Sequence, residues 1–281
     1  QENIVTFNDS LGNIISVSEP ENVAACSGSL AEIWLLAGGE LGGVTQDAYD
    51  EHLFEIPDTV TNLGAMKSPS IEIMISEGID FAIFSSKIAE HCELQTLLNN
   101  AGITAAYFDI ESFKDYLEVL KIFTGITGRS DLYTENGESV QDDISKTILT
   151  SKEKEPPTVL YIRAFSTGAK AKGADTIAGK MLSDLGCKNI VDESPSLLED
   201  LSIEKIIELD PDFIFVTTMG NDEEKALQAL KNSIQSNPAW SELTAVKSDR
   251  YIVLPKALYH YKPNARWGEA YNYLAGILYE Q

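Results

Sequence analysis

The chain has 281 residues, of which 43% are hydrophobic and 23% are charged, as is typical of a globular protein. Its net charge is −23, from 44 acidic and 21 basic residues. Such an acidic surface argues against binding to nucleic acid, which depends on Lys and Arg that neutralise phosphates, and against docking on anionic lipid. No apolar run approaches the roughly 18 residues that a membrane helix needs.

Cysteines and chain length bound the class of protein further. Cys26, Cys92 and Cys187 lie far apart and form no Cys-x-x-Cys pattern. This spacing predicts free thiols rather than a disulfide framework or a zinc ribbon. The length suits two domains, each large enough to have its own core.

The first part of the chain predicts a hairpin followed by alternating strands and helices. Residues 3–18 alternate in polarity around a turn, and a short strand at 23–25 then breaks into a helix at 30–37. Such alternation is typical of parallel βαβ units. We expect the next strands near 43–44, at 81–84 and at 105–108, and the next helices at 70–77 and 90–100.

The alternation stops between residues 112 and 154. A helix over 112–124 is followed by a second one from about residue 130, which must end before Pro156-Pro157 because proline cannot continue a helix. At 1.5 Å per residue, roughly 22 helical residues span more than 30 Å. This length and its acidic character suit a helix that crosses between two domains.

After Pro157 the alternation of strands and helices begins again, so the second half resembles the first. We expect strands at 158–162, 189–191 and 250–254, and helices at 175–185, 222–232 and 264–279.

One pattern, Ser-Ile-Glu-x-x-Ile followed by Asp-Phe, occurs at residues 70–81 and again 132 positions later, at 202–213. A repeated αβ unit predicts two similar halves with a ligand cleft between them. Glu72 and Glu204 fall in the first turn of the two predicted helices, where a carboxylate complements the helix dipole. Alternatively, the two carboxylates grip basic residues of a two-fold symmetric partner.

No segment carries a catalytic or nucleotide-binding signature. The Gly-rich segment 38–43 leaves a helix rather than a strand, so it predicts a helix end. The turn at 166–170 follows a strand and precedes a predicted helix, but it lacks the order of a phosphate-binding loop. His52, His91 and His260 form no His-x-x-x-His pair. We therefore expect no enzymatic activity.

Basic, aromatic and hydroxyl residues gather where strands are expected to end, and ligands of open α/β sheets bind at that edge. The densest stretch is 259–267, after the last predicted strand. In the alternative interpretation, Tyr259 and Trp267 only pack the last helix on the sheet. The predicted ligand-binding residues are Tyr49, Lys67, Lys87, Arg163, Phe165, Tyr259, His260, Tyr261 and Arg266.

In their order and spacing these segments resemble the substrate-binding proteins of bacterial iron-complex and vitamin B12 ABC importers. The resemblance covers nearly the whole chain, from the opening hairpin through both copies of the repeat to Pro263-Asn264-Ala265-Arg266. It implies an α/β fold of two Rossmann-like lobes with parallel central sheets, joined by one long α-helix. The implied limits are 1–128 for the first lobe, 129–155 for the helix and 156–281 for the second lobe.

The resemblance implies that the protein captures an iron chelate in the interlobe cleft and delivers it to an ABC permease dimer. It implies no resident cofactor or metal, and Glu72 and Glu204 match the positions that pair with Arg residues of the permease. It also implies a monomer outside the cytoplasm, at the cell surface or in the periplasm, tethered by a lipid anchor that this chain does not contain.

The identity of the chelate stays open between a ferric siderophore, haem and a corrinoid. Haem-binding members often use Tyr or His as axial ligands, and Tyr259, His260 or Tyr261 suit that role. Aromatic walls suit cobalamin, and we expect an iron chelate in preference to it. A metal-cluster or chelatase-like enzyme would need Cys or His spacings that are absent, and an adhesion module would not need basic and aromatic strand-end loops.

Overall fold

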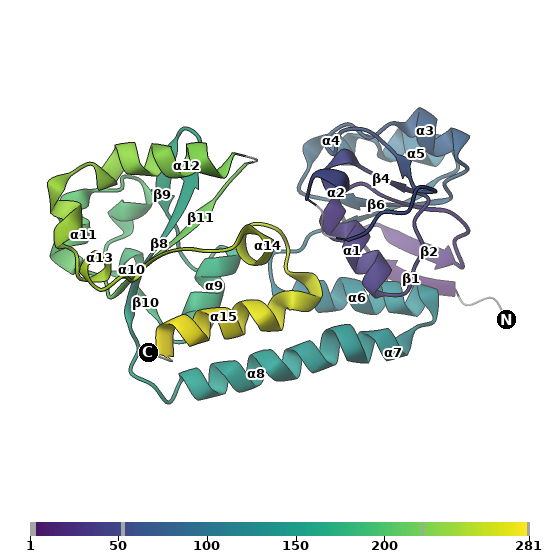
Figure 1. Cartoon of the computed structure of the whole chain (residues 1–281). Helices are drawn as coiled ribbons and strands as arrows, with labels where there is room; N and C mark the ends of the chain where they lie inside the picture. The colour runs from purple at the N-terminus through teal and green to yellow at the C-terminus, as the bar shows by residue number, and fades with distance from the viewer. Residues whose placement is uncertain (1–3, 52–53, 221, 280–281) are drawn as a thin grey trace. The chain divides into compact units, whose positions relative to one another are not determined.

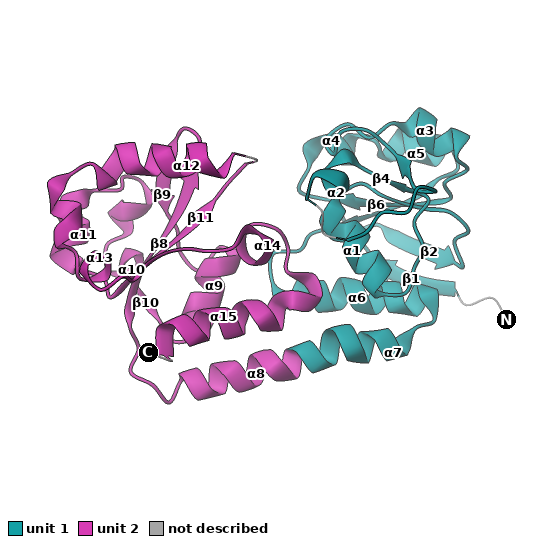
Figure 2. Ribbon diagram, viewed as in Figure 1, with its two compact units in different colours: residues 1–140 teal, residues 141–281 magenta. Residues whose placement is uncertain are grey.

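The computed structural model describes residues 4–51, 54–220 and 222–279. The chain divides into two compact units, 1–140 and 141–281 (Figure 2). Each unit has a mainly parallel sheet with helices around it (Figure 1), so the predicted α/β fold class is confirmed. Within the described part of the chain, no helix combines the length and the apolar character needed to span a bilayer.

Unit 1 is built on a parallel sheet with the strand order β5-β4-β3-β6-β7. Its central strands are runs of buried apolar residues, as expected where helices cover both faces of a parallel sheet. The predicted opening hairpin pairs antiparallel outside this sheet. The strands are β1 (Ile4–Asn8), β2 (Ile14–Ser18), β3 (Val23–Ala25), β4 (Gly43–Val44), β5 (Thr61–Asn62), β6 (Phe81–Ser85) and β7 (Thr104–Phe108).

The helices of unit 1 begin and end at recognisable signals. Ser112 caps α6 in a capping box with Asp115, and Gly128, at φ +71°, ends it in the left-handed conformation that favours glycine. The helix expected at 90–100 is divided at Leu94. The helices are α1 (Gly28–Leu36), α2 (Gln46–Glu51), α3 (Ile71–Ser76), α4 (Ala89–Glu93), α5 (Gln95–Asn100) and α6 (Phe113–Thr127).

The long helix predicted between the lobes is present as one helical stretch from Ser130 to Ser151. It consists of α7 (Ser130–Tyr133), the π-helical turn η1 (Thr134–Glu138) and α8 (Ser139–Ser151). The division between the two units falls inside it, after Val140. The domain limits at 128 and 155 stay a prediction.

Unit 2 has the strand order β10-β8-β11-β12, all parallel, with β9 antiparallel to β8. Two expectations were wrong here. Residues 163–165 belong to the strand rather than to a loop beyond it, and the glycine turn leads into β9 rather than into a helix. The strands are β8 (Thr158–Phe165), β9 (Gly168–Ala171), β10 (Lys188–Asn189), β11 (Phe213–Thr218) and β12 (Tyr251–Val253).

The strand expected at 189–191 was also wrong in part, because only its first residue is in β10. The Asn189 side chain accepts a hydrogen bond from Val191 N at 3.3 Å and so caps a short helix. Buried Ile190 and Val191 look like a strand in sequence, but they pack into the core from α10.

The helical segments of unit 2 are α9 (Ile177–Asp184), α10 (Ile190–Glu193), η2 (Pro195–Leu198), α11 (Ile203–Leu209), α12 (Glu223–Leu230), η3 (Lys231–Gln235), η4 (Pro238–Glu242), α13 (Thr244–Lys247), α14 (Lys256–Tyr259), η5 (Asn264–Arg266) and α15 (Trp267–Tyr279). The predicted last helix thus begins as a 3-10 turn and continues as α15.

The two copies of the repeat have the same local structure. In unit 1 the repeat forms α3 and leads into β6, and in unit 2 it forms α11 and leads into β11. The first serine of each copy caps its helix, since Ser70 accepts from Ile73 N and Ser202 from Lys205 N. The strand that follows the helix pairs in the same way in each unit. In unit 1, β6 pairs with β3 through Phe81 and Val23, and in unit 2, β11 pairs with β8 through Phe213 and Val159.

Candidate functional site

In unit 2, the predicted site residues come from neighbouring strands. β8, β11 and β12 are parallel, so their carboxyl ends lie at one edge of the sheet. Arg163 lies in β8 opposite Thr217 of β11, Met219 follows β11, and His260 follows the short α14 beyond β12. The structure therefore brings three side chains of different chemistry, a guanidinium, a thioether and an imidazole, to this edge.

Of the histidines that the structure describes, only His260 lies at this edge of unit 2. Its Nδ1 lies 3.1 Å from Met219 Sδ, and its ring centroid lies 4.9 Å from that of Tyr261. Burial, followed by the positive charges of Lys256 and Arg163, lowers the pKa of His260 to about 4. The imidazole is therefore neutral at pH 7, and a neutral imidazole is the form that ligates metal.

Arg163 has a buried atom without a partner. Its side chain is half-buried, and its Nε has no hydrogen-bond partner within the described structure. Leaving a buried donor unsatisfied costs about 1–3 kcal/mol, more when the group is charged. Lys170 of β9 is paired opposite Arg163, which adds a second positive charge. An acceptor group of a ligand would satisfy the buried Nε and the local positive charge.

Other predicted ligand-binding residues near this edge are buried or already paired within the protein. Tyr259 is 3% exposed and donates its hydroxyl proton to Ala270 O at 2.7 Å, and Trp267 is 2% exposed. Both residues have the packing role that was the alternative interpretation of the sequence. Arg266 is exposed and pairs with Glu269 at 2.7 Å. Half-buried Phe165 is the last residue of β8.

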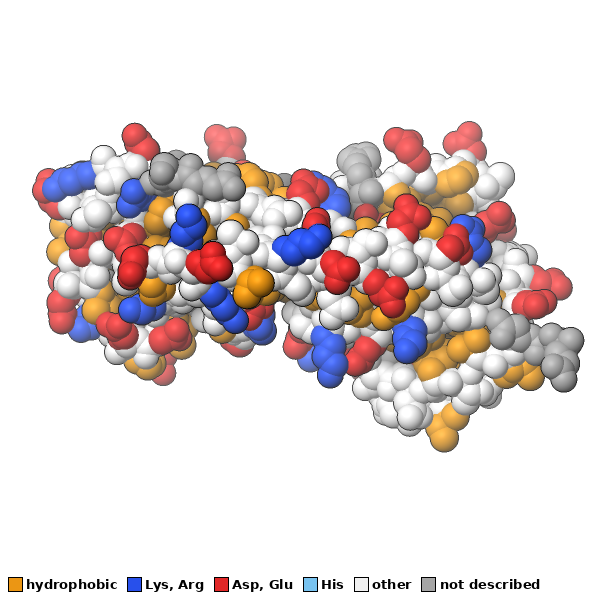
Figure 3. All heavy atoms as spheres, turned by 90° about the horizontal axis from the view of Figure 1, so that it is seen from below, with side chains coloured by type: hydrophobic (Ala, Val, Ile, Leu, Met, Phe, Trp, Pro, Cys, Tyr) orange, Lys and Arg blue, Asp and Glu red, His pale blue; other side chains and the backbone are white. Residues whose placement is uncertain are grey.

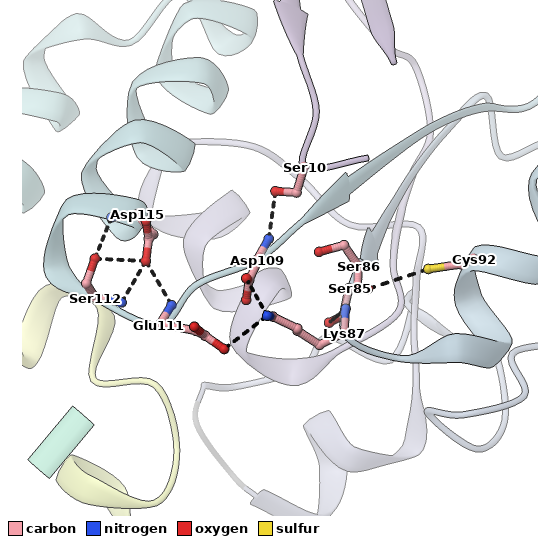
Figure 4. A network of polar contacts seen from close by, with 9 residues as sticks. All are labelled: Ser10, Ser85, Ser86, Lys87, Cys92, Asp109, Glu111, Ser112 and Asp115. Carbon is pink, nitrogen blue, oxygen red and sulfur yellow. Dashed lines mark hydrogen bonds and ion pairs between the residues drawn. The ribbon is translucent and has the colours of Figure 1, made fainter. Parts of the chain in front are cut away.

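In unit 1, Lys87 follows β6 at the carboxyl edge of the sheet. Its Nζ lies 3.1 Å from an Asp109 carboxylate oxygen and 3.2 Å from one of Glu111 (Figure 4). Hydrogen bonds to these two carboxylates raise the pKa of Lys87, so its charge is already balanced. Asp115 Oδ2 fixes the same turn by accepting from the backbone N–H of Glu111 and Ser112.

His91 is buried in unit 1, against the end of β6. Its Nδ1 accepts from Ser85 N at 3.1 Å, so Nε2 carries the proton that it donates to Met66 O at 2.6 Å. Burial lowers the pKa of His91. Both ring nitrogens are thus engaged in holding the segment before exposed Lys67 against the end of β6, which makes His91 a structural residue.

Tyr49 is a further predicted site residue in unit 1. Tyr49 is half-buried on α2 and donates its hydroxyl proton to Val60 O at 3.2 Å. His52 lies outside the described residues. Met219 directly follows β11 but was missed in the sequence, because the pattern sought at strand ends was one of basic, aromatic and hydroxyl residues and its side chain is a thioether.

Glu72 and Glu204 are both exposed, in the first turns of α3 and α11. The backbone N–H of Glu204 and the Ser202 hydroxyl, whose Oγ is 3.0 Å from Glu204 Oε2, lower the pKa of this carboxyl. Glu204 is therefore ionised at neutral pH. In these positions both carboxylates can complement the dipole of their helix, and both remain exposed.

No group of three or more His, Cys, Asp or Glu side chains is placed to hold a metal ion within the residues that the structure describes. A hollow of about 590 Å³ on unit 2 runs along α8 and α15, on a face that carries mixed acidic and basic side chains (Figure 3). Its lining contains none of the residues predicted for the site. The lining residues are Asp143, Lys146, Thr147, Thr150, Ser151, Lys154, Asn272, Ala275 and Tyr279.

Comparison with known proteins defines the class. A family model described as periplasmic binding protein matches residues 23–258, which is most of the chain. The chain therefore belongs to the periplasmic binding protein family, whose members are extracytoplasmic substrate-binding proteins that work with ABC transporters. The resemblance seen in the sequence is confirmed at this level.

Individual proteins of known sequence resemble this chain at low identity. The iron-uptake system-binding protein of Bacillus subtilis (strain 168) is 27% identical over 203 residues, which are 71% of this chain and 62% of that protein. The match thus spans less than two thirds of that relative's length.

Solved structures show the same fold at low identity. PiuA, an iron uptake ABC transporter substrate-binding protein of Streptococcus pneumoniae Canada MDR_19A, has a TM-score of 0.73 at 19% identity, with 98% of each chain covered. Staphylococcus aureus IsdE, complexed with heme, has 0.72 at 15%, covering 92% of this chain and 98% of that one. S. aureus SirA, complexed with staphyloferrin B, has 0.71 at 17%, covering 98% and 97%.

Proposed function

We propose that the protein is the extracytoplasmic binding component of an ABC importer for an iron chelate, either haem or a ferric siderophore, and that it delivers the chelate to the permease. The observation that carries this proposal is the edge of the unit 2 sheet. There the buried Nε of Arg163, which has no partner among the described residues, belongs to a guanidinium whose charge acts on the neutral imidazole of His260.

The chemistry of this edge suits an anionic metal chelate. Arg163 and Lys170 offer positive charge on one face of the β8–β9 hairpin, in a chain whose net charge is −23. Carboxylate or catecholate oxygens are the acceptors that a guanidinium prefers. The ring of His260 and the sulfur of Met219 are ligands that haem iron accepts. The iron-uptake, heme and staphyloferrin B proteins that this chain resembles support the same class of ligand.

The ligand class is tested with the purified chain. Haem, a ferric carboxylate siderophore, a ferric catecholate siderophore and cobalamin are each titrated, with the Soret band and tryptophan fluorescence as the measurements. We expect one of the iron chelates to bind with a Kd well below about 10 μM. Binding of cobalamin alone, or of none of the four, contradicts the proposal. The absorption spectrum of protein isolated from its native host gives an independent identification of the chelate.

Delivery to the permease is proposed to depend on Glu72 and Glu204, one exposed carboxylate in each unit. Charged residues of this kind pair with Arg on a partner and fix its orientation. The double variant Glu72→Ala, Glu204→Ala is expected to bind the chelate as the wild type does but to abolish uptake. Loss of chelate binding together with uptake would show that these residues have been misassigned. We further propose that the protein acts as a monomer held at the outer face of the membrane by a lipid anchor.

A further inference from the structure

The two copies of the repeat expose the same positions. From Ile71 and from Ile203, the successive residues of the two helices are half-buried, exposed, half-buried, buried, exposed and exposed. The three exposed positions in each helix include the glutamate and, three residues later, an isoleucine. These isoleucines are Ile75, which is 55% exposed, and Ile207, which is 36% exposed.

The glutamate and the isoleucine of each copy form one patch. Residues at positions i and i+3 of a helix lie on the same face, so Ile75 stands beside Glu72 and Ile207 beside Glu204. The opposite face of each helix packs into the core through Met74 or Ile206, both 0% exposed. Each isoleucine therefore points outward while its helix is fixed from behind.

An exposed isoleucine in a single place would need no explanation. Here it recurs at the equivalent position in both units, although adjacent surface positions differ. Ile73 corresponds to Lys205, and Ser76 corresponds to Glu208. Within the described residues, Ile75 and Ile207 are the exposed large apolar side chains that occupy matching repeat positions. The shared feature of the two patches is thus a carboxylate with an isoleucine one turn away.

We propose that each docking patch has two parts, and that Ile75 and Ile207 enter apolar depressions on the permease beside the basic residues that pair with Glu72 and Glu204. The inference rests on the proposed function, because it assigns the occupant of these patches. The acidic side chain calls for a basic partner group, and the repetition calls for a partner that offers the same surface twice, as a permease dimer does. Burial of the isoleucines would then supply affinity, while the carboxylates supply orientation.

The test measures binding of the chelate-loaded chain to its ABC importer, reconstituted in lipid nanodiscs. The variants are Ile75→Ala with Ile207→Ala, and Glu72→Ala with Glu204→Ala. A matched control is Leu97→Ala, which removes an apolar side chain that is 57% exposed on α5. Thermal unfolding and chelate affinity are measured for every variant and are expected to equal the wild type.

We expect the isoleucine variant to weaken docking roughly tenfold for each truncated side chain that the interface buries, and Leu97→Ala to leave docking unchanged. If the isoleucine variant docks as the wild type does while the glutamate variant does not, the inference is overturned and the proposed docking through Glu72 and Glu204 stands. If both variants dock as the wild type does, the assignment of these patches to the permease is overturned as well. Replacement of Ile75 alone by Lys provides a second readout, because a charge placed in an apolar depression should weaken docking more than the truncation to Ala does.

Discussion

Asp80 and Asp212 make the same hydrogen bond in the two units. Asp80 stands just before β6, and its carboxylate accepts from the backbone N–H of Asn22, just before β3, at 3.0 Å. Asp212 stands just before β11, and its carboxylate accepts from the backbone N–H of Thr158, the first residue of β8, at 2.8 Å. A second donor completes each pair, Glu21 N in unit 1 and the Thr158 hydroxyl in unit 2. The repeat thus fixes strand register as well as displaying a glutamate.

Replacing either aspartate by alanine is expected to destabilise its own unit. Each substitution removes two hydrogen bonds to a charged acceptor and leaves two backbone N–H groups (Asp80) or one (Asp212) without a partner, a loss of about 2–4 kcal/mol in the free energy of unfolding. Urea unfolding of Asp212→Ala measures the effect, and Asp58→Ala at an exposed position is the control. Equal stability of the two variants would show that the register does not depend on this carboxylate.

Arg163→Met is expected to separate stability from binding. Among the residues that the structure describes, the Nε of Arg163 has no partner and is buried, so its removal relieves a cost in the folded protein and should leave the melting temperature equal or higher. The same change removes the donor offered to an anionic chelate, and we expect its affinity to fall about tenfold or more. Calorimetric titration and thermal unfolding are the two measurements.

The control for Arg163 is Arg266→Met, because Arg266 is exposed and already paired with Glu269. It should change the affinity by less than about threefold, since an exposed ion pair contributes little. If Arg266→Met weakens binding more than Arg163→Met does, the chelate contacts the 3-10 turn at Asn264–Arg266 rather than the β8 edge.

The low pKa of His260 predicts how stability depends on pH. In the unfolded chain a histidine takes up its proton near pH 6.5, whereas in the folded chain His260 does so only near pH 4. Between these values the unfolded state binds more protons, so this contribution to stability is present above pH 6.5 and is lost as the pH falls towards 4. The melting temperature of the wild type should therefore fall faster over this range than that of His260→Gln.

The NMR titration of the imidazole resonances tests the same residue directly. The His260 signal should titrate near pH 4 in the absence of ligand. A midpoint near 6.5 would mean that neither burial nor the charges of Lys256 and Arg163 act on this ring. Binding of haem through the imidazole would instead remove the titration from the accessible range.

Tyr259→Phe distinguishes packing from ligand contact. The hydroxyl of Tyr259 is buried and donates to Ala270 O, and burial raises its pKa, so it stays protonated as a donor at neutral pH. Its loss should lower the free energy of unfolding by about 1 kcal/mol and leave chelate affinity unchanged. A loss of affinity without a loss of stability would return Tyr259 to the ligand-binding set.

Local patterns in the sequence were sufficient for most of the fold. The duplicated Ser-Ile-Glu motif correctly indicated two units with the same capped helix and following strand, since caps and periodicity act over a few residues. The strand 158–165 was expected to be shorter because its pairing partner, Gly168–Ala171, is too short and too rich in small residues to resemble a strand by itself.

What only the tertiary structure decided is the state of individual side chains. The sequence grouped Tyr259, His260 and Tyr261, yet Tyr259 is turned into the core while His260 lies against Met219, which is 41 residues away. Asp9 likewise reads as a turn residue, but its carboxylate accepts from Tyr107 N, 98 residues further on. Composition and spacing follow from the chain alone, whereas burial and charge arise from neighbours that are distant in sequence, and these set which groups are available to a ligand.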